Sequence, residues 1–437
     1  MKQLIFSCML FCMALSGQCQ FVPQPLNYPG TGYWPFYYSI IDPDHLWVGT
    51  FHESGLPCAF SVKTTDGGDT WIFDTIPAPG NPGCVSVCGW DINTCFFVFA
   101  DMSGNTDPSV WKTTNGGTSW SNMITTQFTG SFINFYHAFS ADTGIAVGDP
   151  TDGYFEIQLT DDAGANWTRI PSSAIPAILP GEMGLNHSYS AMGNSVWFTT
   201  SKARCFRSVN RGQTWEVTQL FSGGNQDLGV CFSSAQEGAI WRRSSNPDPL
   251  VVTTDGGITW NTVSFPVGYI IQDMCRVPGW DGGFVVTAYK TGMRVYFTPD
   301  MFNTLTVLES AILSNGAVEF YDVATGWLGG GESGTNEIYK FSWVLNTGEL
   351  PAGQQQKLAI IPNPSSGQTV LKLPEGLDFN NHEIRISDMT GREVVCFPVR
   401  EQDYSYLDAS CFRNGSYLVG LYSGNTILSW GRWFVIH

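Results

Sequence analysis

Short runs of alternating apolar and polar residues cover most of the chain, and turns rich in Gly, Asp and Asn separate them. Runs of this length with a period of two are typical of half-buried β-strands. No long segment shows the apolar spacing of three and four residues that an amphipathic helix requires. The pattern therefore predicts an all-β protein.

One turn phrase, Thr/Ser-x-Asp/Asn-x-Gly-x-x-Trp, recurs at nearly even intervals. Its polar residue, glycine and tryptophan are Asp66, Gly68 and Trp71; Asn115, Gly117 and Trp120; Asp162, Gly164 and Trp167; Asn210, Gly212 and Trp215; and Asp255, Gly257 and Trp260. A weaker sixth copy, at 298–305, keeps Asp300 but has neither the glycine nor the tryptophan. Successive tryptophans lie 49, 47, 48 and 45 residues apart. A period near 47 residues with strand-like flanks indicates propeller blades.

The chemistry of the phrase is that of a turn. The Asp or Asn side-chain oxygen accepts hydrogen bonds from nearby backbone N–H groups, and the glycine adopts backbone angles that other residues avoid. The tryptophan then starts the next strand and packs between layers. The phrase resembles the Asp box, or BNR repeat, and we expect a structural rather than a catalytic role for its residues.

A second phrase precedes each turn and reads as a buried strand, with copies at 45–49, 95–99, 144–148, 195–199, 238–241, 283–286 and 326–329. We interpret each blade as four strands, A to D, and this phrase as strand B. In the third blade, A is near 133–139, B is 144–148, C is 154–159, and D starts at Trp167. Seven B strands predict a seven-bladed β-propeller over residues 20–345, with six and eight blades as alternatives. The seventh blade lacks an obvious strand D, which residues 21–27 would supply to close the ring.

The Asp boxes together with these strands resemble the YCF48-like and the sortilin- and sialidase-like propellers over residues 30–345. The resemblance implies the fold and leaves the function open, because propellers host many functions.

The sequence changes style after a polar linker, residues 346–357, and a separate module follows at 358–437. It contains a Pro-Asn-Pro-Ser-Ser-Gly opening at 362–367, a turn at 388–391, Leu407-Asp408, a strand after Asn414 and a terminal strand. This module resembles the type A C-terminal sorting domain of the type IX secretion system of Bacteroidetes. The resemblance implies a small antiparallel β-sandwich, recognition by the secretion machinery, and removal of the tail with attachment of the protein to surface lipopolysaccharide. A generic adhesive β-sandwich is the alternative.

The other end of the chain predicts export. Lys2 and the apolar run 4–15 read as a signal peptide over residues 1–19, and lipidation at Cys19 is the less favoured alternative. No later segment is apolar enough to span a membrane, so we expect a secreted or cell-surface protein. Nine cysteines would remain, an odd number, so at least one would be free or paired between chains. Cys88 with Cys95, and Cys396 with Cys411, are candidate disulfides, whereas Cys205, Cys231 and Cys275 read as buried thiols.

The net charge of −17 argues against a nucleic-acid partner. Charge is also uneven, with 3 basic and 16 acidic residues over 21–199 but 9 basic and 8 acidic over 200–300. The B–C loops should line the face opposite the Asp boxes. They predict a ligand face with an acidic side and a basic side, suited to a polar or anionic partner, with ordinary solvated loops as the alternative. The candidate residues are His52, Asp101, Asp149 and Asp152, then Lys202, Arg242, Arg243, Tyr289 and Lys290.

Enzymatic chemistry finds little support in the sequence. Sialidases need three arginines, and Arg169, in a phrase similar to the sialidase one, reads instead as a solvated residue of an outer strand. Asp149 with Asp152, and Asp101 with Asp107, are carboxylate pairs that suit a glycosidase, although turn aspartates are the simpler interpretation. The histidines have no metal-like spacing, and no cofactor fingerprint is present. We therefore expect a non-catalytic protein- or glycan-binding module, with a secreted glycan-active hydrolase and a structural adhesion role as the alternatives.

Overall fold

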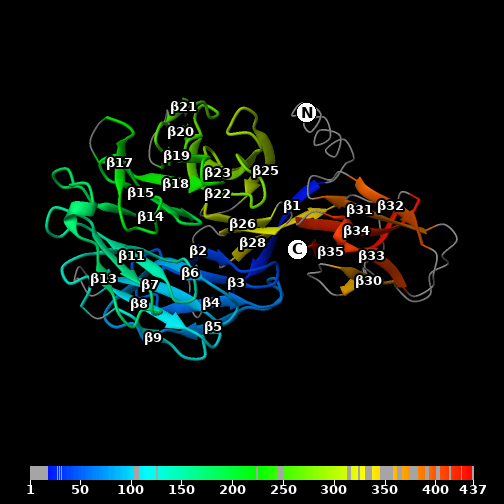
Figure 1. The fold of residues 1–437 in the computed structure, drawn as a ribbon, viewed down its shortest axis with the longest axis horizontal. Helices are drawn as coiled ribbons and strands as arrows, with labels where there is room; N and C mark the ends of the chain where they lie inside the picture. The colour runs from blue at the N-terminus through cyan, green and yellow to red at the C-terminus, as the bar shows by residue number, and fades with distance from the viewer. Residues whose placement is uncertain are drawn as a thin grey trace. The chain divides into compact units, whose positions relative to one another are not determined.

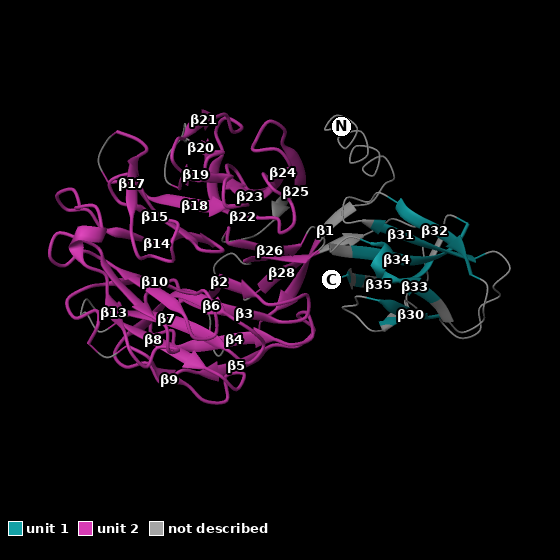
Figure 2. Cartoon of the chain, in the orientation of Figure 1, with its two compact units in different colours: residues 1–19, 343–437 teal, residues 20–342 magenta. Residues whose placement is uncertain are grey.

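The computed structural model divides the chain into two compact units, Gln20–Ser342 and a second unit of Met1–Cys19 with Trp343–His437 (Figure 2). The structure describes residues 18–435 apart from 27, 29, 31, 103–107, 125, 223–224, 244–249, 313–315, 323–324, 330–336, 345–357, 362–366, 374–381, 389–392, 400–403, 413–414 and 425. Most of the predicted signal peptide, the whole predicted linker at 346–357 and most of the Pro-Asn-Pro opening lie outside the described residues.

Four-stranded sheets follow one another along the first unit and fan around a common centre (Figure 1). Blade 1 holds β2 (Tyr33–Ile40), β3 (Leu46–His52), β4 (Phe60–Thr64) and β5 (Ile72–Thr75). Blade 2 holds β6 (Pro82–Gly89), β7 (Cys95–Asp101), β8 (Ser109–Thr113) and β9 (Ser121–Asn122). Blade 3 holds β10 (Ile133–Ala138), β11 (Gly144–Gly148), β12 (Glu156–Thr160) and β13 (Thr168–Arg169), and is followed by the 3₁₀ turn η1 (Ser172–Ala174).

The next three blades repeat the same order. Blade 4 holds β14 (Gly184–Met192), β15 (Ser195–Thr200), β16 (Arg204–Ser208) and β17 (Glu216–Gln219). Blade 5 holds β18 (Leu228–Phe232), β19 (Gly238–Arg242), β20 (Leu250–Thr253) and β21 (Asn261–Val263). Blade 6 holds β22 (Ile270–Arg276), β23 (Phe284–Tyr289), β24 (Met293–Thr298) and β25 (Thr306–Ile312). The predicted propeller fold is thus confirmed, and the predicted strands of blade 3 agree with the observed ones to within about two residues.

Blade 7 combines the two ends of the propeller. Its order is β1 (Gln18–Pro25), β28 (Glu337–Val344), β27 (Thr325–Gly329) and β26 (Val318–Asp322), so the N-terminal strand takes the outer position. The ring of Phe21 packs on that of Phe341, 5.2 Å away between centroids. The prediction that the N-terminal segment completes the last blade is confirmed, with the strand starting three residues earlier than expected. With this sheet, the described residues of the first unit form seven four-stranded sheets.

The apolar core lies between neighbouring sheets rather than in one central mass. Each cluster of buried side chains joins two successive blades, for example Trp47 of blade 1 with Phe97 of blade 2. The same arrangement seats Trp197 of blade 4 against Phe232 of blade 5, with ring centroids 3.6 Å apart. Burial of these large aromatic surfaces is the main force that holds the sheets side by side.

The Asp-box turns join strands C and D, and each is organised around the hydroxyl of its first residue. In the first turn, Oγ1 of Thr64 accepts the N–H of Gly68 (2.8 Å) and donates to Oδ1 of Asp66 (2.8 Å). The same carboxylate oxygen accepts the N–H of Thr70 (2.9 Å). Hydrogen bonds from the side chain and backbone of Thr70 lower the pKa of Asp66 to about 2, so this carboxylate stays ionised.

The degenerate sixth copy forms the same turn. Oγ1 of Thr298 accepts the N–H of Phe302 (2.9 Å), and Oδ1 of Asp300 accepts the N–H of Thr304 (2.8 Å). Phe302 occupies the place of the glycine with a φ of 67°, where the glycines of the five regular copies have φ between 84° and 96°. The hydroxyl and the carboxylate therefore specify the turn strongly enough to impose a left-handed backbone on a bulky residue.

Several polar side chains of strands B and C fasten one blade to the turn of the next. The ammonium of Lys63 in blade 1 donates to the carbonyl of Gly116 in blade 2, and Lys112 of blade 2 donates to the carbonyl of Ala163 in blade 3 (3.4 Å). Lys340 of blade 7 makes the equivalent bond to Gly67 of blade 1, across the closure of the ring. In blade 4, the indole of Trp197 takes this role and donates to Gly256 (2.8 Å).

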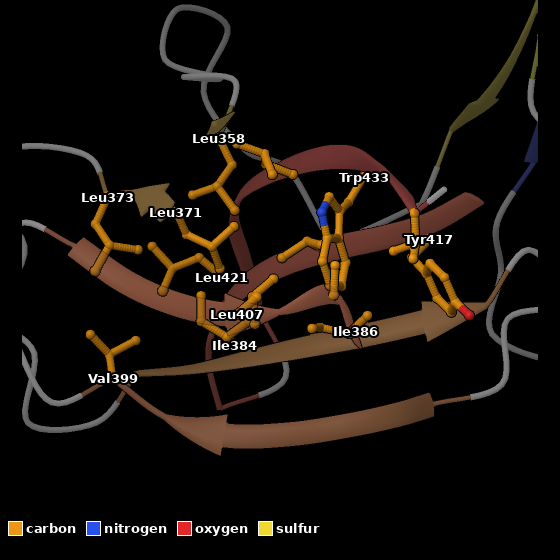
Figure 3. Close-up of a cluster of buried hydrophobic side chains, with 14 residues drawn as sticks. Leu358, Leu371, Leu373, Ile384, Ile386, Val399, Leu407, Tyr417, Leu421 and Trp433 are labelled. Atoms are coloured by element: carbon orange, nitrogen blue, oxygen red, sulfur yellow. The ribbon is translucent and has the colours of Figure 1, made fainter. Parts of the chain in front are cut away.

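The second unit carries two sheets, one of β29 (Ala359–Ile361), β30 (Gln368–Lys372) and β33 (Tyr404–Asp408), and one of β32 (Glu393–Pro398), β31 (His382–Asp388), β34 (Gly415–Ser423) and β35 (Thr426–Val435). The 3₁₀ turn η3 (Ala409–Cys411) follows β33. Leucines from the smaller sheet, such as Leu371, pack with Ile384, Leu421 and Trp433 of the larger one (Figure 3). The predicted small antiparallel β-sandwich is confirmed, and its core has contributions from both sheets.

Both candidate disulfides are wrong, because the described cysteines are all free. Cys88 lies opposite Phe96 in the ladder and Cys95 lies opposite Gly89, so the two thiols point to opposite faces of the same sheet. Cys396 is on β32, whereas Cys411 follows β33 of the other sheet. Cys205, Cys231 and Cys275 are buried thiols as predicted, and burial raises the pKa of each.

Replacement of Thr253 by valine tests the role of the turn hydroxyl. Thr253→Val keeps the shape of the side chain but leaves the buried N–H of Gly257 without its acceptor. We expect the free energy of unfolding to fall by about 1–3 kcal/mol, measured by urea denaturation. Thr262→Val, on the exposed surface of β21, is the matched control and should change it by less than about 0.5 kcal/mol. Equal effects of the two changes would contradict the assigned role.

Candidate functional site

Two edges of the propeller differ in their connections. In blades 1 to 6, the N–H that follows the turn Asp or Asn donates to a carbonyl of the A–B connection, as Gly67 does to Asp44 (2.9 Å) and Gly256 to Gln236 (2.8 Å). The Asp boxes and the A–B connections therefore share one edge, which we name the box edge. The B–C and D–A connections share the other, which we name the loop edge.

The candidate residues on the acidic side of the loop edge mostly make contacts within the propeller. His52 is buried, with its ring edge-on to Tyr33 (4.6 Å between centroids), and its Nδ1 accepts the N–H of Ser54 (3.1 Å). Oδ1 of Asp149 accepts the N–H of Gly184 in the next blade (2.8 Å), and burial raises the pKa of Asp149. Asp101 ends β7 and is partly exposed.

Asp152 is exposed and belongs to an ion-pair network. Its carboxylate lies 3.4 Å from the guanidinium of Arg169, which also pairs with the buried carboxylate of Glu156 at 2.7 Å. As predicted, Arg169 is an exposed residue of the outer strand β13, and in addition it supplies the cation that the buried Glu156 of β12 needs. The ion pairs with Asp152 and Glu156 give Arg169 a structural role in blade 3.

On the basic side, each described side chain also has neighbours. Lys202 donates to Asn225 (2.8 Å), and Lys290 donates to the carbonyl of Val267 (3.3 Å) and lies over the ring of Tyr269. Arg242 lies over Phe221, with 5.6 Å between the guanidinium carbon and the ring centroid. Arg204, the first residue of β16, is buried in an ion pair with Glu182 and does not contribute to this surface.

Arg243 points inward instead of outward. Its guanidinium donates to the carbonyl of Leu228 (2.9 Å), lies 3.3 Å from Asp227 and donates to the carbonyl of His187 in blade 4. The predicted basic arc is thus represented at the surface by Lys202, Arg242 and Lys290, with the exposed ring of Tyr289 beside it.

Apolar side chains, which the sequence reasoning did not single out, share the loop edge with these charges. Seven of the large exposed hydrophobic residues lie at the ends of strands B or in the B–C and D–A connections: Phe51, Leu56, Met102, Leu179, Met183, Val267 and Tyr289. Val267 is 85% exposed and Leu56 53%. They come from blades 1, 2 and 6 and from the connections before blades 4 and 6, so they are distributed around the edge.

A cavity of about 460 Å³ lies on the axis of the propeller. The A strands that line it are β2, β6, β10, β14, β18, β22 and β26, mainly in their later parts. It extends past the end of β6 to Trp90, which is 43% exposed, so the cavity reaches the surface at the box edge.

His187 closes the cavity on the side of the loop edge. Its φ of 53° and the register shift between Gly184 and Tyr189 show that β14 bulges here toward the axis. The imidazole contacts the rings of Phe36 and Tyr37 in blade 1, at 5.1 and 5.3 Å between centroids. Its Nε2 lies 3.2 Å from Oδ2 of Asp273 in blade 6. One side chain of blade 4 therefore spans the channel to blades 1 and 6.

Asp273 and Glu319 bring two carboxylates into this cavity, and Arg276 brings a guanidinium. Oδ2 of Asp273 also accepts the N–H of Val318 (3.0 Å), so this carboxylate joins blades 4, 6 and 7. Burial raises the pKa of Glu319 to about 8; Arg276 acts against this shift and Asp273 adds to it. Burial also lowers the pKa of His137, on the cavity wall, to about 4, so that imidazole is neutral.

Sequence reasoning missed this axial cluster. The available signal was the presence of Asp273, Glu319 and His137 inside runs that otherwise read as buried strands, since a charged group there needs either a partner or a cavity. Within the parts of the chain that the structure describes, no three His, Cys, Asp or Glu side chains are grouped so as to hold a metal ion.

Residues 359–436 match the model of the secretion system C-terminal sorting domain. Residues 359–436 are a type IX sorting domain. The protein is therefore secreted or carried on the outer cell surface, and its tail implies contact with the secretion machinery. Among the described residues, no helix is long and apolar enough to cross a membrane.

Comparison with solved structures gives propellers. A YCF48 protein bound to a D1 peptide is 17% identical, with a TM-score of 0.54, and the match covers 74% of this chain and 96% of that one. YCF48 from Cyanidioschyzon merolae is also 17% identical, with a TM-score of 0.55 and coverage of 74% and 98%. An ancestral GH74 enzyme is 13% identical, with a TM-score of 0.50 and coverage of 94% and 63%. At these identities the likeness shows the fold alone, and no curated protein matches the chain.

The titration of Glu319 predicts how stability depends on pH. The folded-state pKa of Glu319 is about 8, whereas an exposed glutamate titrates near 4.3. The stability that the protonated side chain gives to the folded protein is therefore intact below pH 4 and is lost as the pH rises to about 8. We expect Glu319→Gln to remove this loss, so the variant gains stability relative to the native protein between pH 5 and pH 9, by an amount on the order of a few kcal/mol. Urea denaturation at both pH values measures it. If the free energies of unfolding of the two proteins differed by the same amount at pH 5 and at pH 9, this would contradict the burial of an ionisable carboxyl at this position.

Proposed function

We propose that this exported propeller is a non-catalytic binding protein that holds a protein or a glycan against its loop edge. The observation that carries the proposal is the ring of exposed apolar side chains at that edge, including Leu56, Met183 and Val267, among charged and aromatic ones. Exposed apolar groups surrounded by polar ones are typical of interaction surfaces.

The state of the charged groups supports the same proposal. Lys202 and Lys290 at the surface are each held by a neighbouring oxygen, and Asp149 is held by a backbone N–H. Groups that are already ordered lose little conformational entropy when a partner binds, which favours affinity. The mixture of acidic and basic groups favours a partner with matching charges over a purely apolar one.

The structural neighbours are consistent with this role. One of them is a YCF48 protein bound to a D1 peptide, so in that structure a protein of the same fold binds a peptide. Because the identity is low, we take from it only that peptide binding is compatible with the fold.

Two aspartate substitutions test the loop edge. Met183→Asp and Val267→Asp should each weaken binding at least about fivefold for any ligand found, because a buried apolar contact is worth more than about 1 kcal/mol in the centre of an interface. Glycan arrays and peptide arrays probed with the purified protein supply the ligands. Val209→Asp and Ile258→Asp, at the box edge, are the matched controls and should retain binding. Loss of binding in the controls alone would overturn the proposal.

A glycan-active hydrolase is the second candidate, and one observation favours it. Glu319, whose pKa is raised to about 8, shares the axial cavity with the carboxyl group of Asp273. Two carboxyl groups in one cavity, one of them able to donate a proton at neutral pH, are what an acid–base mechanism requires. The hydrogen bonds of Asp273 to His187 and Val318 count against it, because they occupy this carboxylate.

A panel of chromogenic glycosides distinguishes the two candidates. We expect no hydrolysis by the native protein above that of Glu319→Gln. Turnover that Glu319→Gln abolishes, with the variant still folded by thermal melting, would replace the binding proposal by the hydrolase.

A further inference from the structure

The axial cavity contains more carboxyl groups than guanidinium or ammonium groups among the described residues. Its carboxylates are Asp273 on β22 and Glu319 on β26, and its one described guanidinium is that of Arg276 on β22. The other titratable groups on its wall are neutral near pH 7, because burial raises the pKa of the thiols of Cys88, Cys231 and Cys275 and of the phenols of Tyr37, Tyr38 and Tyr189, and lowers that of His137. His187, the remaining one, is the partner of Asp273.

The two carboxylates differ in how they are satisfied. Asp273 accepts the N–H of Val318 and lies within hydrogen-bond distance of His187. Glu319 is partly exposed and lines the cavity, and it accepts no hydrogen bond from any residue that the structure describes. A carboxylate that lines a cavity without a hydrogen-bond partner is costly, so this side of the cavity is short of hydrogen-bond donors.

Arg276 does not supply them by a direct hydrogen bond. Among the described residues, its Nη1 contacts the sulfur of Met192 at 3.8 Å, and it acts on Glu319 only through its charge. Even with this cation nearby, burial dominates and the protonated form of Glu319 is favoured at neutral pH.

We infer that the axial cavity binds a protonated primary amine on a flexible stem, such as the end of a lysine side chain, which enters at the box edge and pairs with Glu319. An ammonium offers three donors and a positive charge. The cavity of about 460 Å³ is within the size range of small-ligand pockets, and His187 lies across its far end in contact with blades 1 and 6, so the cavity suits a short stem. Tyr38 and Trp90 add aromatic surface on the way in, which suits a cation.

This inference does not depend on the proposed loop-edge function, because the cavity and the loop edge are on opposite sides of His187. A failure of either leaves the other unaffected.

Calorimetric titration with 1,5-diaminopentane, which mimics a lysine side chain, tests the inference on the full chain. Because Glu319 must ionise to pair with the amine, we expect roughly tenfold tighter binding at pH 9 than at pH 7, where its carboxyl is mostly protonated. Glu319→Gln should weaken binding at pH 9 at least tenfold and remove the pH dependence. Asp69→Asn, which removes one exposed carboxylate from the first Asp-box turn, is the control of equal charge change and should bind as the native protein does.

A second variant keeps the test decisive if Glu319→Gln fails to fold, which thermal melting reveals. Trp90→Ala, at the mouth of the cavity, should weaken binding several-fold and retain the pH dependence. Absence of binding at pH 9, or equal binding to Glu319→Gln, overturns the inference. Binding of sodium acetate in place of the amine also overturns it and assigns the cavity to anions through Arg276.

Discussion

The hydroxyl at the end of each C strand in blades 1 to 6 is the contact on which the propeller depends. It accepts a backbone N–H four residues on and donates to the side chain of the turn Asp or Asn, so it fixes the corner between strands C and D. The corner in turn offers an N–H to its own A–B connection. In blades 1, 2, 3 and 5 it also offers a carbonyl to a lysine or tryptophan of the preceding blade. A local turn thereby sets the spacing between sheets, and the aromatic layers fill the spaces so defined.

Much of this architecture could be predicted from sequence because it is encoded locally. The repeat of Asp, Gly and Trp predicted the turns and the strand order, and the missing D strand of the last blade predicted its closure by the N-terminal segment. Reasoning from the sequence failed where the outcome depended on which face of a sheet a side chain occupies and on which side chains it meets there. Cys88 and Cys95 are close in sequence but on opposite faces of a sheet, and Arg204 and Arg169 meet buried glutamates that the sequence does not place beside them.

The axial cluster could not be predicted for a related reason. Asp273, His187 and Glu319 come from three blades and are 46 to 132 residues apart in sequence. Their meeting depends on the closure of the ring and on a bulge in β14, and neither leaves a periodic signal. The sequence shows only that charged residues interrupt apolar strands, which indicates a cavity or a buried pair without saying which.

The two ends of the channel are chemically unlike. At the loop edge, side chains from several blades present a mixed surface whose charged groups are already ordered. Toward the box edge, the interior is a cavity that opens to the surface beside Trp90 and is short of hydrogen-bond donors. His187 separates the two, and it holds this position through rings of blade 1 and the carboxylate of blade 6.

The shared last blade has a consequence for how the protein matures. Its strands come from the two extremes of the propeller, β1 and β26 to β28, while the strands of the sorting domain begin at Ala359. No sheet of the propeller borrows a strand from the sorting domain within the described residues, so a cleavage beyond Val344 would leave every blade whole. The sheet is complete only when the first and last segments of the propeller have both emerged from the ribosome, which makes ring assembly a late, post-translational event.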